Sequence, residues 1–361
     1  MKTVFYETNG EDRQLLSDTL KAYPDIQAEY IADKLSADNI QAAKDAEAIS
    51  VFVGSEVKKQ QIDAMPNLKL IATRSTGFDH IDVAYAKSKN ITVCNVPAYG
   101  SRTVAEFAFA LILSLSRKLF VAADQIKEGK GFDYQAFEGF NLQGKTIGIV
   151  GTGRIGLNVA QIAKGFDMDI LGFVAFPNEE KAKEYGFKYV GLDELLSSSD
   201  IVTLHVPYMK ETHHLINKDN LGKISAKGGH ASRSGSEALQ GRMTGGKKAP
   251  ILINTARGEV VDTEALLMAL KDGTLGGAGL DVLEGERQLK DETTLIAQAD
   301  PKHPSLDELK ILIEDHALIN MPNVIITPHI AFYSKEAKHE ILKITAENII
   351  NFKKSQPKNT I

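Results

Sequence analysis

The sequence predicts an α/β protein with two doubly wound parallel sheets. Short β-branched runs alternate with helical apolar patterns along most of the chain, which is typical of parallel strands joined by crossover helices. One of these runs, residues 146–150, ends at a glycine-rich turn that opens a helix. With 361 residues, of which 43% are hydrophobic, the chain is long enough to form two domains.

The first hundred residues contain short apolar runs that we interpret as buried strands. These runs are residues 3–6, 48–53, 70–72 and 91–94. Helical patterns separate them, for example at residues 58–65 and 83–88. The alternation predicts one parallel sheet with right-handed crossovers.

A second alternating series follows Pro97 and Gly100. It opens with a long apolar helix, predicted over residues 103–119, which could connect domains, form a dimer surface or lie in a core. Strands are then predicted at residues 146–150, 170–174, 201–206, 251–254, 276–282 and 324–327. An amphipathic helix at 335–352 closes the chain. The strands of this series predict a second doubly wound sheet.

Two segments interrupt the series. Residues 226–248 are rich in Gly, Ser and basic side chains, which predicts a flexible loop. Because this loop leads into the start of the strand at 251–254, we expect it on the side of the sheet away from ligands, which bind beyond the carboxyl ends of strands. Residues 287–321 instead follow a carboxyl end, so we expect them at an active-site rim, with a short helix at 305–316.

Composition argues against several partners and locations. The formal net charge is -5 and no long basic run occurs, which argues against nucleic acid as a partner. The longest apolar stretch, residues 107–113, is too short to cross a membrane, and the first ten residues lack the apolar core of a signal peptide. Cys94 has no intramolecular disulfide partner, and we expect it to be a small buried side chain. These features predict a cytoplasmic protein with no membrane partner, and we assign no metal site.

The glycine turn after residue 150 has the spacing of a dinucleotide fingerprint. Gly151 would permit the tight turn, Gly153 would let a pyrophosphate approach the backbone, and Gly156 would let the following helix pack closely on the strand. The helix N-terminus would receive the phosphates. Glycines between a strand and a helix can also form a simple turn, but the flanking strand and helix patterns favour nucleotide binding.

Three further stretches with chemically reactive side chains lie just beyond predicted strand ends. Arg257 could clamp a carboxylate with two parallel hydrogen bonds, or it could be a surface arginine in a salt bridge. Asp281 could accept hydrogen bonds from a ribose or from a backbone turn. Glu286 could pair with His329, although a lone histidine is more often structural than catalytic.

Convergence at one edge of the sheet favours the functional interpretation. Arg257, Glu286 and His329 all follow the carboxyl ends of strands, the edge at which the glycine turn would hold a dinucleotide. A carboxylate beside His329 would favour the imidazolium form and make it a general acid. These residues predict hydride transfer to a small carboxylate substrate.

Six motifs together resemble one known family. They are VPAYGSRTVAEFAF, GTGRIG, TLHVP, INTARGEVVD, GLDVLEGE and TPHIAFYS. On these motifs the chain is identified as a member of the D-isomer-specific 2-hydroxyacid dehydrogenase family, and it is most similar to the D-lactate dehydrogenase branch. The resemblance covers essentially the whole chain apart from residues 226–248.

The resemblance implies two Rossmann-like or flavodoxin-like parallel-sheet domains with a cleft between them. A discontinuous substrate domain would comprise residues 1–100 and 331–361, and a dinucleotide-binding domain would comprise residues 101–330. The resemblance also implies a cleft that closes on substrate and a homodimer that uses the helix at 103–119.

It also implies roles for individual residues. Arg257 resembles the substrate-binding arginine, His329 the acid/base and Glu286 its carboxylate partner, while Asp281 resembles an aspartate near the nicotinamide. The backbone at Thr76 and Gly77 resembles a loop that holds the substrate carboxylate, and Tyr99 and Tyr333 resemble aromatic residues that line a pocket for a small acid. The implied cofactor-binding residues are Thr103, Gly151, Gly153, Arg154, Ile155, Gly156, Val174, Val206, Pro207, Thr255, Ala256 and Asp281.

The implied reaction is hydride transfer from NADH to C2 of a 2-keto acid such as pyruvate, which gives the D-2-hydroxy acid. One position departs from the family pattern, because Val174 stands where an aspartate usually binds the adenosine ribose. Valine cannot accept ribose hydrogen bonds and would not repel a 2′-phosphate. No arginine lies within residues 174–178, and Lys181 is the nearest cation in sequence, so we expect both NAD and NADP to be accepted.

Alternatives remain within and outside this enzyme class. Hydroxyisocaproate, glycerate and phosphoglycerate dehydrogenases share a set of Arg, Glu and His residues that matches Arg257, Glu286 and His329. The two pocket tyrosines favour a small unphosphorylated acid. The C-terminal-binding-protein corepressors, which use the fold to sense NAD(H), can retain this set too. The lactate-like pocket motifs favour the enzyme.

Overall fold

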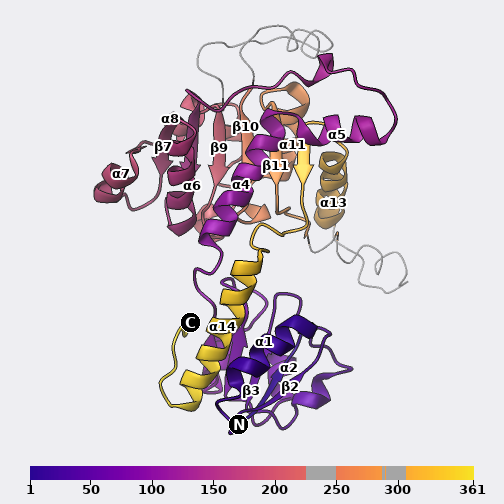
Figure 1. Cartoon of the computed structure of the whole chain (residues 1–361), viewed down its shortest axis with the longest axis vertical. Helices are drawn as coiled ribbons and strands as arrows, with labels where there is room; N and C mark the ends of the chain where they lie inside the picture. The colour runs from indigo at the N-terminus through magenta and orange to yellow at the C-terminus, as the bar shows by residue number, and fades with distance from the viewer. Residues whose placement is uncertain (225–248, 287–288, 290–305) are drawn as a thin grey trace. The chain divides into compact units, whose positions relative to one another are not determined.

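The computed structural model describes residues 1–224, 249–286, 289 and 306–361. The chain divides into two compact units, each a parallel sheet with helices (Figure 1). Unit 1 comprises Met1–Gly100 and Tyr333–Ile361, and unit 2 comprises Ser101–Phe332. The predicted fold class, with two parallel α/β sheets, is confirmed. The predicted loop at 226–248 lies outside the described residues. So do residues 287–288 and 290–305 of the segment that we expected at an active-site rim.

Unit 1 contains a five-stranded sheet in the order β2-β1-β3-β4-β5, with every neighbouring pair parallel. The strands are β1 (Lys2–Phe5), β2 (Gln27–Tyr30), β3 (Ala48–Val51), β4 (Leu70–Thr73) and β5 (Thr92–Cys94). The four strands expected from sequence are present. The edge strand β2 was not predicted, because its sequence QAEY has no apolar run and its residues are only partly buried or exposed.

Helices cover both faces of this sheet, as a doubly wound fold requires. On one face α1 (Gly10–Leu20) packs against α14 (Lys335–Lys353), and both bury apolar side chains against β1 and β4. The other face is covered by α2 (Lys59–Asp63), α3 (Val83–Ser88) and the short helix η1 (Ile40–Ala43). Cys94 is fully buried, as expected, and burial raises the pKa of its thiol to about 11.

Unit 2 contains a seven-stranded parallel sheet in the order β12-β11-β10-β9-β6-β7-β8. The strands are β6 (Thr146–Val150), β7 (Asp169–Phe173), β8 (Lys188–Tyr189), β9 (Ile201–Leu204), β10 (Ile251–Asn254), β11 (Gly277–Leu280) and β12 (Val324–Ile326). Six of these were predicted, while the two-residue strand β8 carries no apolar signal. The chain runs outward through β7 and β8 and then returns to β9 on the other side of β6. This reversal creates a topological switch point at the carboxyl end of β6.

Two helical layers enclose the sheet. On one face α4 (Ser101–Ser116) lies beside α6 (Arg154–Gly165), as Figure 1 shows. The described part of unit 2 also contains the helices α5 (Leu119–Lys127), α7 (Glu179–Tyr185), α8 (Leu192–Ser198), α9 (Lys218–Leu221), α11 (Thr263–Asp272), α13 (Leu306–Ile319) and the short helices η2 (Gln135–Phe137), η3 (Lys210–Thr212) and η4 (Gly258–Val260). Within the described ranges, no helix combines the length and the hydropathy that a membrane span requires.

The apolar helix predicted over 103–119 is shorter than expected. It ends at Ser116, and α5 starts after Lys118, whose left-handed φ of 52° breaks the helical path. One side of α4 lies in the core of unit 2 through side chains such as Ile112, while Leu113 is exposed. The helix at 305–316 is present as α13 and extends further, to Ile319.

Candidate functional site

The glycine turn lies at the switch point, between β6 and α6. Gly151 has a φ of +98°, and a Cβ there would lie 2.7 Å from the carbonyl carbon of His205. A Cβ on Gly156 would lie 2.1 Å from the Gly151 carbonyl oxygen. Around Gly153, in contrast, no described atom lies within 4 Å of that position. The turn therefore needs glycine at two positions for packing and leaves the backbone open at the third.

The open backbone fits a dinucleotide phosphate. Gly153 is the N-cap of α6, and because glycine has no side chain the first N–H groups of this helix receive no side-chain cap. Such a helix end attracts anions through its free N–H groups and its dipole. Arg154 and Ile155 are the first residues of α6 and lie beside this opening. These residues can hold the pyrophosphate of a dinucleotide.

His205 is a residue to which the sequence reasoning assigned no role. It follows β9, and its amide donates to the Val150 carbonyl at 2.8 Å, beside the glycine turn. Its ring nitrogens lie 2.8 Å from the Thr203 hydroxyl and 3.4 Å from the Thr255 hydroxyl. Burial lowers the pKa of His205 to about 3, so the ring is neutral. The only signal in the sequence was its place in the motif TLHVP.

Arg257 follows β10 in a loop held by its own strand end. The Asn254 side chain accepts the Ala256 amide at 3.0 Å and donates to the Arg257 carbonyl at 2.9 Å. The guanidinium donates to the Ala256 carbonyl at 2.8 Å, and it has no ion-pair partner among the described residues. A partly buried guanidinium of this kind keeps further N–H groups for a carboxylate.

The Arg257 loop touches the loop that follows β11. A Cβ on Gly258 would lie 2.0 Å from the carbonyl carbon of Leu283, so the two backbones meet without room for a side chain. Glu286 lies three residues beyond Leu283. The structure thus brings the two predicted stretches together along this edge of the sheet.

Glu286 and His329 form the pair that their positions predicted. The two carboxylate oxygens of Glu286 lie 3.0 and 3.1 Å from Nδ1 of His329. Nδ1 is therefore occupied, and Nε2 is the ring nitrogen that can act on a ligand. His329 has a φ of 55°, which is uncommon for a residue with a side chain, and its amide donates to the carbonyls of Asp281 and Thr327 at 2.9 Å.

Asp281 holds the loop that carries His329. It is 1% exposed, and its carboxylate accepts the amides of Ile330 and Ala331 at 2.9 and 2.8 Å and the Thr327 hydroxyl at 2.5 Å. Burial raises the pKa of Asp281, while the hydrogen bonds from Thr327, Ala331 and Ile330 oppose that rise. Of the two interpretations left open by the sequence, the backbone turn is the one that this geometry shows.

The remaining predicted cofactor residues follow strand ends of unit 2 or begin α4. Val174 directly follows β7, and the nearby Asn178 caps α7 by accepting the Lys181 amide at 3.0 Å. Glu179 and Glu180 begin α7. The others are Val206 and Pro207 after β9, Thr255 and Ala256 after β10, and Thr103 in the first turn of α4.

In unit 1 the predicted substrate loop follows β4. The Thr76 hydroxyl donates to the Val96 carbonyl at 2.8 Å, and Asn95 donates to the Thr76 carbonyl at 2.9 Å. The Ser75 hydroxyl donates to the Gly77 carbonyl at 2.6 Å. The loop is thus held in shape by groups other than the Thr76 and Gly77 amides.

A buried arginine, which the sequence reasoning did not single out, supports this loop. The Arg74 guanidinium donates to the Ser50 hydroxyl at 3.0 Å and to the carbonyls of Tyr6 and Glu7. Burial lowers the pKa of Arg74 to about 10. Its only signal was the motif RSTGFD.

The two predicted pocket tyrosines also belong to unit 1. Tyr99 is partly buried and follows β5, whereas Tyr333 is 62% exposed and precedes α14. The structure therefore divides the predicted site residues: those proposed for the substrate carboxylate loop and pocket lie in unit 1, and those proposed for chemistry and cofactor lie in unit 2.

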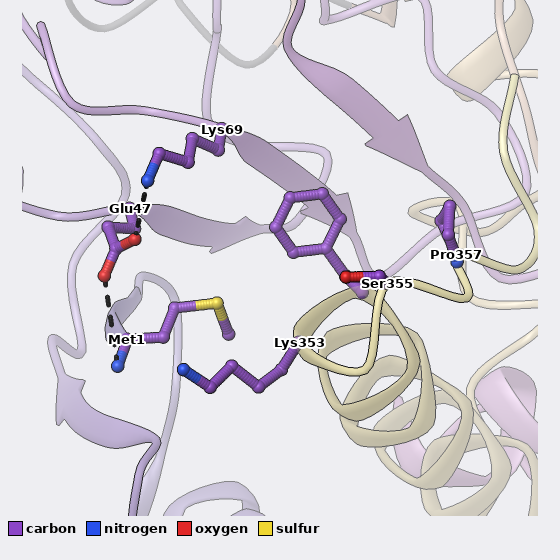
Figure 2. Close-up of a pocket in the computed structure, with 7 residues that line it drawn as sticks. Met1, Glu47, Lys69, Lys353, Ser355 and Pro357 are labelled. Carbon is purple, nitrogen blue, oxygen red and sulfur yellow. Dashed lines mark hydrogen bonds and ion pairs between the residues drawn. The ribbon is translucent and has the colours of Figure 1, made fainter.

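A separate pocket of about 430 Å³ lies in unit 1 (Figure 2). It is lined near the amino ends of β1, β3 and β4, where Glu47 pairs with Lys69 at 2.9 Å and with the Met1 amine at 3.9 Å. The loop with Thr76 and Gly77 follows the carboxyl end of β4, which is the opposite edge of the sheet. This pocket is therefore distinct from the candidate site.

Comparisons with known proteins agree with this geometry. Residues 109–229 and 239–331 match the family model described as "D-isomer specific 2-hydroxyacid dehydrogenase, NAD binding domain". The chain is 35% identical to a glyoxylate reductase of Korarchaeum cryptofilum, over 89% of this chain and 84% of that protein. It is also 35% identical to the D-lactate dehydrogenase kk1H of Curvularia clavata, over 92% of this chain and 86% of that protein.

The fold is also similar to a solved structure. The D-lactate dehydrogenase of Aquifex aeolicus, complexed with NAD and lactic acid, aligns with a TM-score of 0.79 and 36% sequence identity. The alignment covers 98% of this chain and 96% of that one.

Proposed function

Because the chain belongs to the D-isomer-specific 2-hydroxyacid dehydrogenase family, we propose that it reduces a small 2-keto acid, with pyruvate preferred, to the D-2-hydroxy acid. The observation that carries this proposal is the Glu286–His329 pair, with Nδ1 to carboxylate distances of 3.0 and 3.1 Å, at the same sheet edge as the open glycine turn. The reverse reaction, oxidation of the D-2-hydroxy acid, uses the same groups.

Residues of unit 2 have separate roles in the proposed reaction. His329 donates its Nε2 proton to the carbonyl oxygen of the keto acid, and Glu286 stabilises the imidazolium that makes this donation possible. Arg257 binds the substrate carboxylate and polarises the carbonyl. The nicotinamide, when bound, supplies the hydride that reduces C2. The glycine turn and the first residues of α6 hold the pyrophosphate.

The substrate preference is assigned to unit 1. We propose that the Thr76 and Gly77 amides bind the carboxylate and that Tyr99 and Tyr333 limit the size of the acid. The names of the Curvularia and Aquifex relatives support lactate, of which pyruvate is the keto acid, whereas that of the Korarchaeum relative supports glyoxylate as a competing substrate. Steady-state kcat/KM values for pyruvate, glyoxylate, hydroxypyruvate and 2-ketoisocaproate, with the chirality of each product, test the assignment. Turnover of none of them, despite cofactor binding, would contradict it.

We propose that both NADH and NADPH are accepted. Val174 follows β7 at the position where an acidic side chain would bind the adenosine ribose, and it offers no hydrogen-bond acceptor. The acidic residues Glu179 and Glu180 begin α7 and disfavour a 2′-phosphate, so we do not expect a complete change to NADPH. Comparison of kcat/KM for the two cofactors at saturating pyruvate tests this proposal. A preference for NADH above about 100-fold, or about 2.7 kcal/mol, would contradict it.

We propose a homodimer that forms through α4 and the adjacent α5. Leu113 on α4 and three apolar residues of α5 are exposed. They are Leu119, Phe120 and Ile126, with exposures of 59%, 50% and 43%. Molar mass in solution, measured by light scattering for the wild type and for Phe120→Asp, tests this. A wild-type monomer would contradict it.

We further propose a location in the cytoplasm, with no nucleic-acid or membrane partner. The net charge of -5 disfavours binding to nucleic acid, which is also anionic. The single buried cysteine is typical of a protein in a reducing compartment. Cell fractionation followed by immunoblotting tests the location.

A further inference from the structure

The turn formed by residues 284–286 is fixed by contacts from several elements. Oε1 of Glu284 lies 2.8 Å from Nε2 of His214, and Oε2 accepts the Thr263 hydroxyl at 2.7 Å. Glu286, two residues later, contacts His329. The Glu286 amide donates to the Leu283 carbonyl at 3.3 Å, and the Gly285 amide lies between the two glutamates.

Asp315 holds that amide. This residue of α13 is fully buried, at 0% exposure, and its Oδ2 accepts the Gly285 amide at 3.1 Å. A Cβ on Gly285 would lie 2.4 Å from the same oxygen and 2.9 Å from Cγ2 of Ile311, so the backbone of the turn rests directly on α13. The position leaves room for no other side chain at residue 285.

The carboxyl of Asp315 is buried near two other carboxylates. Its Oδ1 is buried and has no hydrogen-bond partner among the described residues. Glu284 from the turn and Glu314 from α13 oppose its ionisation, while the Gly285 amide and His316 favour it. Burial is the largest effect and raises the pKa of Asp315 to about 7. Among the described residues, the Gly285 amide is thus the hydrogen-bond donor that reaches this buried carboxyl.

We propose that Asp315 is a positioning residue for the Glu286–His329 pair, which it orients through the Gly285 amide. The inference rests on the proposed function, in which that pair is the acid/base. Asp315 itself touches neither substrate nor cofactor in this proposal. Loss of its acceptor oxygen frees the turn, moves the Glu286 carboxylate from Nδ1 and weakens the imidazolium that donates the proton.

Three variants test the proposal. Asp315→Ala removes the acceptor, Asp315→Asn keeps an acceptor oxygen but removes the charge, and Gly285→Ala displaces the turn from the other side. We expect kcat for pyruvate to fall about 10- to 100-fold in Asp315→Ala, which is only part of the contribution of general acid catalysis, with the KM for NADH unchanged. Asp315→Asn should stay within about threefold of the wild type.

A double-mutant cycle separates positioning from general destabilisation. If Asp315 acts through Glu286, then Asp315→Ala adds less than about twofold to the loss of kcat in a Glu286→Gln background, because the partner is already lost. Multiplicative losses in the double variant would overturn the proposal. A loss in Asp315→Asn as large as in Asp315→Ala would also overturn it, since the acceptor oxygen is retained.

NMR spectra of His329 report on its position without any turnover of substrate, so they test the role of Asp315 independently of the proposed function. The ring signals of His329 in NMR spectra of the wild type, identified by their loss in His329→Gln, should shift in Asp315→Ala and Gly285→Ala and stay nearly unchanged in Asp315→Asn. Asp12→Asn, which alters a buried carboxylate of unit 1, serves as the matched control and should leave those signals unmoved. Unshifted signals in folded Gly285→Ala would overturn the inference, whereas a wild type that reduces no 2-keto acid would overturn the proposed function alone.

Discussion

The backbone carbonyl of Asp281 accepts the amide of His329 at 2.9 Å, and the Asp281 carboxylate accepts the amides of the two residues that follow His329. The end of β11 and the loop after β12 are thereby joined into one structure. Because His329 has a left-handed φ of 55°, it depends on such contacts to keep its conformation. The position of His329 is thus determined by contacts with the end of a strand other than its own.

Replacement of His329 by Gln should remove the proposed proton donor and leave the loop intact. We expect kcat for pyruvate to fall by about 10²- to 10⁴-fold, the usual contribution of general acid catalysis, while NADH still binds. Steady-state kinetics together with fluorescence titration of NADH measure the two effects. Near-normal turnover would show that another group donates the proton.

Replacement of Arg257 by Ala should act mainly on substrate binding. The guanidinium can form two charge-assisted hydrogen bonds to a carboxylate, each worth about 1.5–3 kcal/mol, so we expect the KM for pyruvate to rise by at least about tenfold. Arg257→Lys is the matched control, and it should recover only part of the loss because an ammonium cannot bind in the same two-point manner. An unchanged KM in the alanine variant would argue that the carboxylate binds elsewhere.

Replacement of Asp281 by Ala should affect both stability and catalysis. The amides of Ile330 and Ala331 and the Thr327 hydroxyl would lose their acceptors, at a cost of up to about 1–3 kcal/mol for the buried Ala331 amide, and the His329 loop would loosen. We expect a lower Tm and a lower kcat per folded molecule. Asp281→Asn, which keeps one acceptor oxygen, should lie between the wild type and the alanine variant in both measurements.

Replacement of Val174 by Asp should favour NADH. The new carboxylate would accept hydrogen bonds from the ribose hydroxyls and would repel a 2′-phosphate, so the ratio of kcat/KM for NADH to that for NADPH should rise by about 10- to 100-fold. Val174→Asn, of similar size but without the charge, is the control for the repulsion. No change in the ratio would place the ribose away from the end of β7.

Ionisation of Asp315 should make the stability of the protein depend on pH. Burial raises the pKa of this carboxyl from 3.8 to about 7, so between these values the folded protein keeps a proton that the unfolded chain has released. Ionisation of Asp315 therefore lowers the stability of the wild type as the pH rises from about 4 to 7, by up to about 4 kcal/mol, and Asp315→Asn lacks this contribution. The Tm difference between the two proteins, measured from pH 4 to 8, should grow in favour of the variant. A constant difference would contradict the raised pKa.

Prediction from sequence succeeded where a local pattern was strong. Apolar runs predicted the buried strands, and the glycine spacing between β6 and α6 predicted both the turn and its open backbone. The edge strands β2 and β8 were missed because half-buried or two-residue strands carry no run to detect. The single long helix was broken after Ser116 by one left-handed residue, which no periodicity indicates.

The candidate site shows the same division. Parallel strands place their carboxyl ends at one edge, so the sequence by itself determined that Arg257, Glu286 and His329 would lie there, and the pairing of the last two followed from their charges. His205, Arg74 and Asp315 could not be found in this way. Asp315 meets Gly285 across thirty positions of the chain, and only the packing of α13 against the turn decides that contact. Hydrogen bonds between distant residues leave no periodic trace in a sequence, because they depend on how whole elements pack.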